Sequence, residues 1–166
     1  EYAVCPGTVA GEFDETRHGF VNHGFAAMLA DMTAALRLMF RANRRVLVLL
    51  TVSPVPLTAT ASGQHVLTAT SHSKSLLRAV ASELAQSQVR VDYFPSYEII
   101  THPAYRGRFF ALNMRSVLPE GVDHVMAQFF RDQAAAFGGE SALPPVPVAP
   151  VAAEEEAPEP ELSEAE

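Results

Sequence analysis

The sequence contains one cysteine and no tryptophan, and none of its apolar runs approaches the length of a membrane helix. A disulfide needs two cysteines, so Cys5 cannot form one within the chain, and such sparse cysteine is typical of a reducing compartment. A membrane-spanning helix needs about 20 apolar residues, and a secretory signal places a basic stretch before an apolar one. The sequence has neither, so we expect a soluble, cytoplasmic protein without a membrane span.

Basic residues are too scattered to indicate a nucleic-acid partner. The net charge of −7 arises from residues 138–166, which hold eight glutamates and no Lys or Arg. The rest of the chain has 11 acidic and 12 basic side chains, so its charges nearly cancel. Proteins that bind nucleic-acid phosphates carry a clustered basic face, whereas here only Arg44 and Arg45 are adjacent. We expect no nucleic-acid partner.

Two segments space their apolar residues by three and four positions, as amphipathic helices do. They cover residues 25–43 and 119–137, and Pro119 suits a first helical turn, just as Gly138-Gly139 suits a helix end. The stripes predicted to be buried are Phe25, Met28, Leu29, Met32, Leu36, Met39 and Phe40 in the first helix, and Val122, Val125, Met126, Phe129 and Phe130 in the other.

Another helix is predicted between these two, with Ser71 or Ser73 as its amino-terminal cap. Its predicted buried stripe consists of Leu76, Leu77, Val80, Ala81 and Leu84. The charged residues of the same helix are predicted to face water, namely Lys74, Arg78 and Glu83.

Strands are predicted at residues 45–52 and 90–94, with a further short one at residues 2–4. Helices and strands then alternate along the chain, which predicts an α/β fold with a parallel sheet, because parallel neighbours need long crossover connections. Two or three strands make a thin sheet. Since the sequence also opens without Met, we expect an incomplete domain whose remaining strands precede residue 1 and whose apolar sheet edge promotes association.

The expected domain covers residues 1–137. Residues 138–166 are rich in Pro, Ala and Glu and poor in bulky apolar side chains, so they are predicted to be a disordered acidic tail.

Polar residues follow both predicted strands. The first strand runs into TVSPVPLTATASG, where the prolines stop strand pairing near Ser53, and the second runs into Ser96, Tyr97 and Glu98. Ligands usually bind at the carboxyl edge of an open α/β sheet, so Ser53 and Glu98 are candidate cleft residues. The alternative is structural: the serines bond to nearby backbone, and Glu98 is solvated or pairs with an arginine.

No metal or cofactor site is predicted. The six histidines show no HxH or HExxH spacing. His124 is expected to be an ordinary surface or core residue unless it serves as a base. TASGQH lacks the ending of a phosphate-binding loop, and Cys5 has no neighbouring base to activate it.

Five strings together resemble the GSCFA domain family, which is grouped with SGNH-type hydrolases and esterases. They are CPGTVAGEF, TVSPVPLTATASGQHVL, SKSLLRAV, VDYFPSYEII and RFFALNMRSVLPEGVDHVM, within about residues 3–131. The resemblance implies a three-layer α/β/α fold and a nucleophilic serine in a Gly-Ser-Cys-Phe-Ala motif. That motif does not occur in this sequence.

The resemblance also implies an acidic residue and a histidine three positions apart before the last helix, the histidine acting as the base. Asn113 and Ser116 occupy those positions here, and a serine hydroxyl is a negligible base near neutral pH. Three alternatives stay open: His124 or His102 replaces the base, the chain has lost catalysis and kept a binding cleft, or the pair aligns elsewhere.

The resemblance implies the carboxyl-terminal part of an ester hydrolase or acyl transferase that acts on a small-molecule or carbohydrate ester, with this chain inactive by itself. Ser53, Glu98, Asn113 and His124 are its candidate site residues. The alternatives are a non-catalytic module that binds carbohydrate or protein, and a tail that tethers a basic partner.

Overall fold

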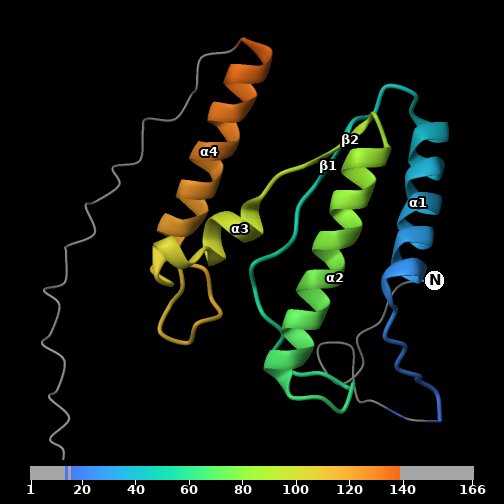
Figure 1. Ribbon diagram of the computed structural model, residues 1–166, viewed down its shortest axis with the longest axis vertical. Helices are drawn as coiled ribbons and strands as arrows, with labels where there is room; N and C mark the ends of the chain where they lie inside the picture. Colours follow the sequence, from blue (N-terminus) through green and yellow to red (C-terminus); the bar gives the residue numbers. More distant parts are fainter. Residues whose placement is uncertain (1–13, 15, 139–166) are drawn as a thin grey trace, which may run out of the picture.

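The computed structural model describes residue 14 and residues 16–138 (Figure 1). The predicted strand at residues 2–4, Cys5 and the predicted tail from residue 139 onward lie outside the described residues. The elements, in chain order, are α1 (Phe25–Ala42), β1 (Val48–Leu50), α2 (Val66–Ser87), β2 (Val91–Tyr93), α3 (Ser96–Thr101), the 3₁₀ helix η1 (Pro103–Tyr105) and α4 (Pro119–Phe137).

The two strands form a parallel pair, so the predicted α/β class and the predicted strand direction are confirmed. Val48 lies opposite Val91, and Leu50 lies opposite Tyr93. Helix α2 provides the crossover between the strands. In Figure 1 the strands lie between α4 on one side and the neighbouring helices α1 and α2 on the other.

The start of α2 differs from the predicted one. The helix begins at Val66, and neither Ser71 nor Ser73 caps it. The cap is His65, whose Nδ1 accepts a hydrogen bond from the backbone N–H of Leu67 at 3.3 Å. The imidazole nitrogen of His65 accepts the hydrogen bond that a serine oxygen usually accepts at this position. Histidine is not among the residues preferred as helix caps.

The core lies where α1 and α2 pack on the strands. Leu36, Val80, Leu84 and Val91 are buried together, and these further apolar side chains pack against them: Met28, Leu29, Met32, Phe40, Val48 and Leu50. Most of the stripe predicted for α1 is therefore confirmed. Phe25 and Met39 are exposed instead and do not pack against this core.

Lys74 contradicts the prediction for α2. It was predicted to face water, yet it is buried, with 8% of its surface exposed. Leu77 shows the opposite deviation, since it was predicted in the buried stripe and is exposed. The rest of the predicted stripe of α2 is confirmed, since Val80, Ala81 and Leu84 are buried and Leu76 is half-buried. The helix also meets the segment that follows β1, where the backbone N–H of Leu57 bonds to Thr70.

Helix α4 packs on α3 and on the segment that connects η1 to α4. Gly121 and Ala127 are its buried residues, against Ile100 and Phe109, which are also buried. The ring of Phe129 meets Phe94 edge to face at 5.3 Å. Three residues of the predicted stripe, Val122, Met126 and Phe130, are exposed.

The strands leave an apolar groove open toward α4. A cavity of about 450 Å³ lies there, and its lining includes Leu47, Leu49 and Phe137, which are all exposed. Both strands are edges of the described sheet. Among the described residues, no helix is long and apolar enough to cross a lipid bilayer.

Substituting Leu84 tests the core. Leu84 is 1% exposed, whereas Leu67 on the same helix is 69% exposed. We expect Leu84→Ala to lower the free energy of unfolding by about 2–5 kcal/mol, because it removes buried surface and leaves a cavity. The matched Leu67→Ala variant should change it by less than about 0.5 kcal/mol. Equal losses in urea titrations of the two variants contradict the packing described.

Substituting Gly121 tests the docking of α4. A Cβ at Gly121 would lie 2.9 Å from the Cβ of Phe109 and 3.1 Å from a methyl of Val117. Alanine normally stabilises an open helix by about 1 kcal/mol relative to glycine, but here we expect Gly121→Ala to destabilise by about 1–3 kcal/mol through overpacking. Gly19→Ala is the control, since nothing lies within 4 Å of its added Cβ. A stabilised Gly121→Ala variant in thermal melts would show that α4 is not packed here.

Candidate functional site

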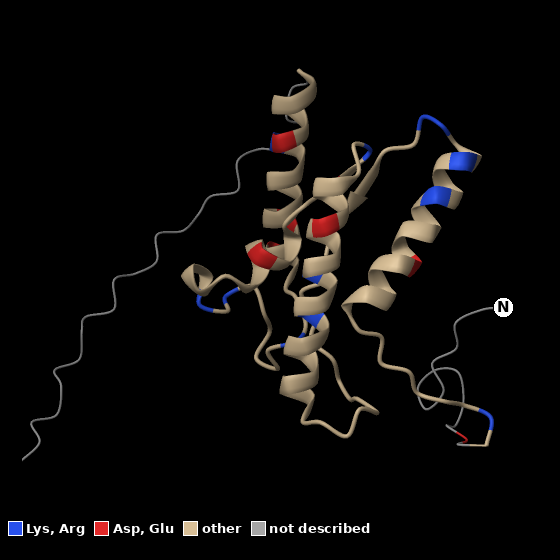
Figure 2. Ribbon diagram, turned by 45° about the vertical axis from the view of Figure 1, so that its right-hand side comes forward, with Lys and Arg blue, Asp and Glu red and all other residues tan. Residues whose placement is uncertain are grey.

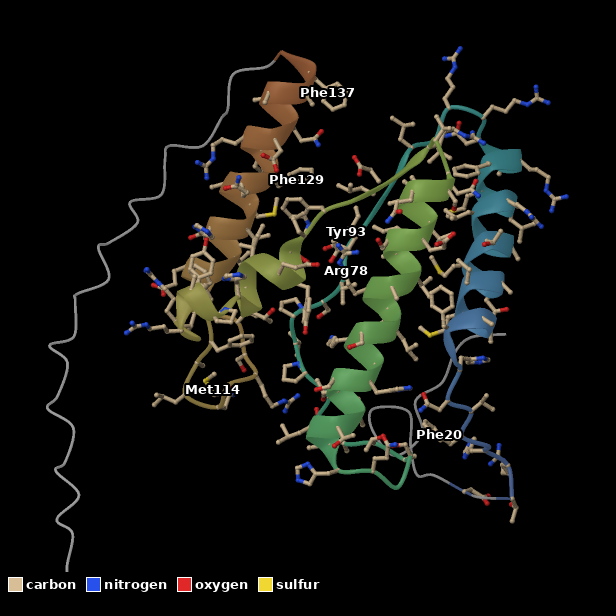
Figure 3. All side chains as sticks on the ribbon, viewed as in Figure 1. Phe20, Arg78, Tyr93, Met114, Phe129 and Phe137 are labelled. Carbon is tan, nitrogen blue, oxygen red and sulfur yellow. The ribbon has the colours of Figure 1, made fainter. Side chains whose placement is uncertain are left out.

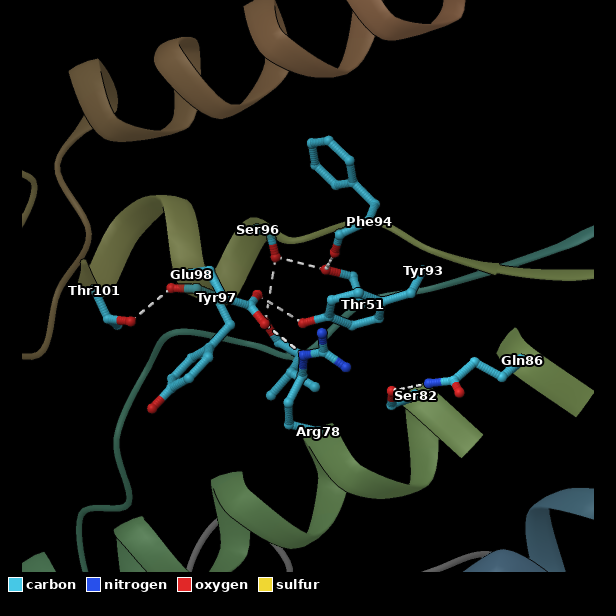
Figure 4. Close-up of polar contacts among 11 residues, drawn as sticks. Thr51, Arg78, Ser82, Gln86, Tyr93, Phe94, Ser96, Tyr97, Glu98 and Thr101 are labelled. Atoms are coloured by element: carbon cyan, nitrogen blue, oxygen red, sulfur yellow. Dashed lines mark hydrogen bonds and ion pairs between the residues drawn. The ribbon is translucent and has the colours of Figure 1, made fainter. Parts of the chain in front are cut away.

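The carboxyl ends of β1 and β2 lie side by side and are joined by hydroxyl groups (Figure 4). Thr51 Oγ1 donates to the carbonyl of Phe94 at 2.8 Å and lies 2.6 Å from Ser96 Oγ. Ser96 Oγ also donates to the carbonyl of Val52 at 3.2 Å. These contacts cross between the segments that leave the two strands, so they fix the polar edge of the sheet.

Glu98 is the centre of the charged part of this edge. One carboxylate oxygen accepts a hydrogen bond from Arg78 Nε in an ion pair, and the other accepts from the Tyr93 hydroxyl at 2.8 Å. The Arg78 guanidinium also lies over the Tyr93 ring, 4.0 Å from its centroid. Figure 3 shows the two labelled side chains next to each other beside α2. Helix α2, strand β2 and helix α3 each contribute one of the three side chains.

The contacts among the three side chains shift the pKa values of Glu98 and Tyr93. Burial of Glu98 opposes its ionisation, but the hydrogen bonds from Arg78 and Tyr93 together outweigh it and hold the pKa of the carboxyl below its usual value. Burial, followed by the bond to Glu98, raises the pKa of the Tyr93 phenol far above its usual value. At neutral pH the carboxylate therefore accepts, and neither group is poised to exchange a proton.

In the segment after β1, Ser53 bonds to nearby backbone. Ser53 is exposed, and its hydroxyl accepts from the backbone N–H of Val55 at 3.3 Å. Farther along, Thr58 accepts a hydrogen bond from Arg115 Nη2 at 2.6 Å. Arg115 thereby ties the loop before α4 to the loop after β1, while its Nε is buried without a hydrogen-bond partner among the described residues.

Asn113 and Ser116 contact each other within the loop before α4. Asn113 Nδ2 donates to Ser116 Oγ at 3.0 Å, and Asn113 Oδ1 accepts from the backbone N–H groups of Arg115 and Ser116 at 3.0 Å each. The two side chains thus meet at the i and i+3 spacing expected of an acid and a histidine. Both residues are exposed.

His124, on α4, forms an aromatic cluster with Tyr105 and Phe109, which precede that helix. Its ring stacks on Phe109 with centroids 5.0 Å apart, and its Nε2 lies 3.1 Å from the Tyr105 hydroxyl. Burial lowers the pKa of His124, and the nearby Arg131 and Arg108 lower it further, so the ring is neutral at physiological pH. The other histidine candidate, His102, is exposed and accepts from the backbone N–H of Ala104.

The structure therefore does not join the four candidate residues into one constellation. Within the described part of the chain, no hydrogen bond or ion pair links Glu98 to Ser53, Asn113 or His124. Thr51 and Tyr93 also belong to the polar edge of the sheet and were not predicted as site residues, although both are polar residues at strand ends. Among the same residues, no three His, Cys, Asp or Glu side chains gather to hold a metal ion.

The chain matches the model of a known protein family. The model of the GSCFA family matches residues 2–129. No curated protein and no solved structure matches the chain. The match covers most of the sequence, so the chain belongs to the GSCFA family, as the five strings indicate.

Replacing Glu98 tests the role of its contacts in stability. The lowered folded-state pKa means that the carboxylate stabilises the fold above the unfolded value of about 4.3, and that this contribution is lost as the pH falls through the folded-state pKa. We expect Glu98→Gln to lower the free energy of unfolding at pH 7 by about 0.5–1 kcal/mol, since the pair is partly exposed.

The difference between Glu98→Gln and the parent chain should disappear at pH 2, where both side chains are uncharged. Thermal melts at both pH values measure it. Glu83→Gln is the control, because Glu83 is exposed and makes no ion pair with a described residue. A difference that persists unchanged at pH 2 contradicts the electrostatic account.

Proposed function

We propose that this GSCFA domain is part of an SGNH-type ester hydrolase or acyl transferase with a three-layer α/β/α fold, acting on a small-molecule or carbohydrate ester. The nucleophilic serine belongs to the Gly-Ser-Cys-Phe-Ala motif, which this sequence does not contain, so residues 1–137 supply one wall of the cleft and are inactive by themselves. We place the protein in the cytoplasm, with residues 138–166 as a tail outside the domain.

The observation that carries the proposal is the position of the loop with Asn113 and Ser116. The two side chains meet at 3.0 Å, directly before α4, and Arg115 between them bonds to Thr58 in the loop that leaves β1. The positions at which the family resemblance expects an acid and a histidine are thus linked to the loop that starts at the carboxyl end of β1. Ligands of α/β proteins bind at that edge of the sheet. Asn113 still offers an amide that can donate a hydrogen bond to a bound oxygen.

A non-catalytic binding module is the second candidate, and the lack of an available base among the candidate residues favours it. Both oxygens of Glu98 are occupied by Arg78 and Tyr93, and Ser116 cannot accept a proton near neutral pH. His124 does not make good the loss, because its nitrogen faces the Tyr105 hydroxyl within an aromatic cluster. A cleft with these residues can bind an ester without cleaving it.

Restoring the acid and histidine separates the two candidates. In a longer protein that joins this chain to its Gly-Ser-Cys-Phe-Ala segment, we expect Asn113→Asp combined with Ser116→His to raise p-nitrophenyl acetate hydrolysis about a hundredfold or more, because general base catalysis contributes on that order. Asn113→Asp alone should give no comparable gain, since an orienting carboxylate has no imidazole to act on.

Two further variants of the longer protein complete this test. Changing the motif serine to alanine should abolish the activity of the double variant, and His124→Gln should leave turnover unchanged. An equal rate with and without the motif serine rules out the esterase proposal. A loss of turnover in His124→Gln, with the melting temperature unchanged, instead identifies His124 as the base.

A further inference from the structure

Lys74 has a largely buried side chain and a charge without a partner among the described residues. It is 8% exposed, and it forms no hydrogen bond or ion pair with any residue in the described ranges, 14 and 16–138. Burial lowers the pKa of its ammonium, and no carboxylate offsets that effect. The Lys74 nitrogen is not among the buried polar atoms that lack a hydrogen bond, so the aliphatic stem accounts for the burial and the charge reaches the solvent of a surface pocket. There it is available to a group supplied from outside.

Lys74 lines a surface pocket together with Arg78, which lies one turn farther along α2. The pocket has a volume of about 470 Å³, and its other lining residues are Ser75, Ala79, Ser82 and Tyr97. Figure 2 shows these Lys and Arg positions in the middle of α2, away from the cationic residues at the end of α1. Since Arg78 also pairs with Glu98, the pocket adjoins the polar edge of the sheet.

The lining specifies the charge and the polarity of a ligand. Lys74 and Arg78 carry two positive charges, and Glu98 neutralises one of them, so a single negative charge balances the group. A carboxylate has that charge, whereas a phosphate monoester exceeds it at neutral pH. The hydroxyls of Ser75, Ser82 and Tyr97 provide further hydrogen-bonding groups, and Ser82 Oγ accepts from Gln86, which leaves its own proton free to donate.

We propose that this pocket binds a small, hydroxyl-rich carboxylate such as a uronic acid, with the carboxylate on Lys74 and the sugar hydroxyls on the serine and tyrosine side chains. The volume is within the range of small-molecule sites. The inference depends on the pocket and not on ester hydrolysis, so a chain without any catalytic activity still binds the ligand.

The test uses the fact that Lys74 is the sole lysine of the sequence. In a chain of residues 1–166 labelled with ¹³C-lysine, one side-chain signal reports Lys74. Adding glucuronate should shift this signal and raise the pKa of Lys74, because a carboxylate favours the charged ammonium. The methyl ester of glucuronate, which has no charge, should do neither. An unmoved signal at saturating glucuronate overturns the proposal.

Calorimetry of variants gives the second measurement. Lys74→Met should weaken glucuronate binding about tenfold or more, as expected for a lost hydrogen bond to a charged group, and Lys74→Arg should retain most of it. Arg41→Met, which removes one positive charge from α1, is the matched control and should bind as the parent does. Equal affinity in Lys74→Met and the parent overturns the proposal.

Inorganic phosphate provides the last comparison. Phosphate should bind more weakly than glucuronate, and tighter binding of phosphate overturns the carboxylate assignment. All of these measurements detect binding without turnover, so a failure of the esterase proposal leaves them interpretable.

Discussion

The parallel pairing of β1 with β2 is the constraint on which the rest of the structure depends. Parallel strands cannot be joined by a tight turn, and α2 supplies the long crossover between Leu50 and Val91. The same pairing brings both carboxyl ends to one edge, where Thr51 meets Ser96. The core and the polar edge therefore have one origin, since α2 buries Leu84 against the strands and presents Arg78 to the groups that follow them.

Glu98 shows how this edge divides its residues between structure and chemistry. A carboxylate that accepts from both Arg78 and Tyr93 is held in one place and one charge state. That arrangement connects α2, β2 and α3, and by lowering the pKa of the carboxyl it makes Glu98 a weaker base. The pocket beside this ion pair is lined by Lys74, while the amide of Asn113 lies in a separate loop, tied through Arg115 to Thr58.

The sequence predicts the elements better than it predicts the site, and the reason is physical. Periodic apolar residues such as Leu36, Val80 and Leu84 determine which helix faces are buried, so the core follows from spacing. The short helix α3 has no such period, and it directly follows a proline that reads as a strand end. Contacts between distant segments, such as Arg115 with Thr58, leave no local pattern at all.

Lys74 shows the limit of arguments from charge. A lysine on a helix is expected to face water because burying its ammonium is costly. Only 8% of Lys74 is exposed, yet its nitrogen still reaches the solvent of the pocket, so the stem is covered and the charge is not. The groove beside β1 shows the converse, because Leu49 and Phe137 are apolar and yet exposed. Lys74 and the groove both lie at the surface of the described part of the chain. At Lys74 the described residues supply no negative charge, and along the groove they leave apolar side chains exposed.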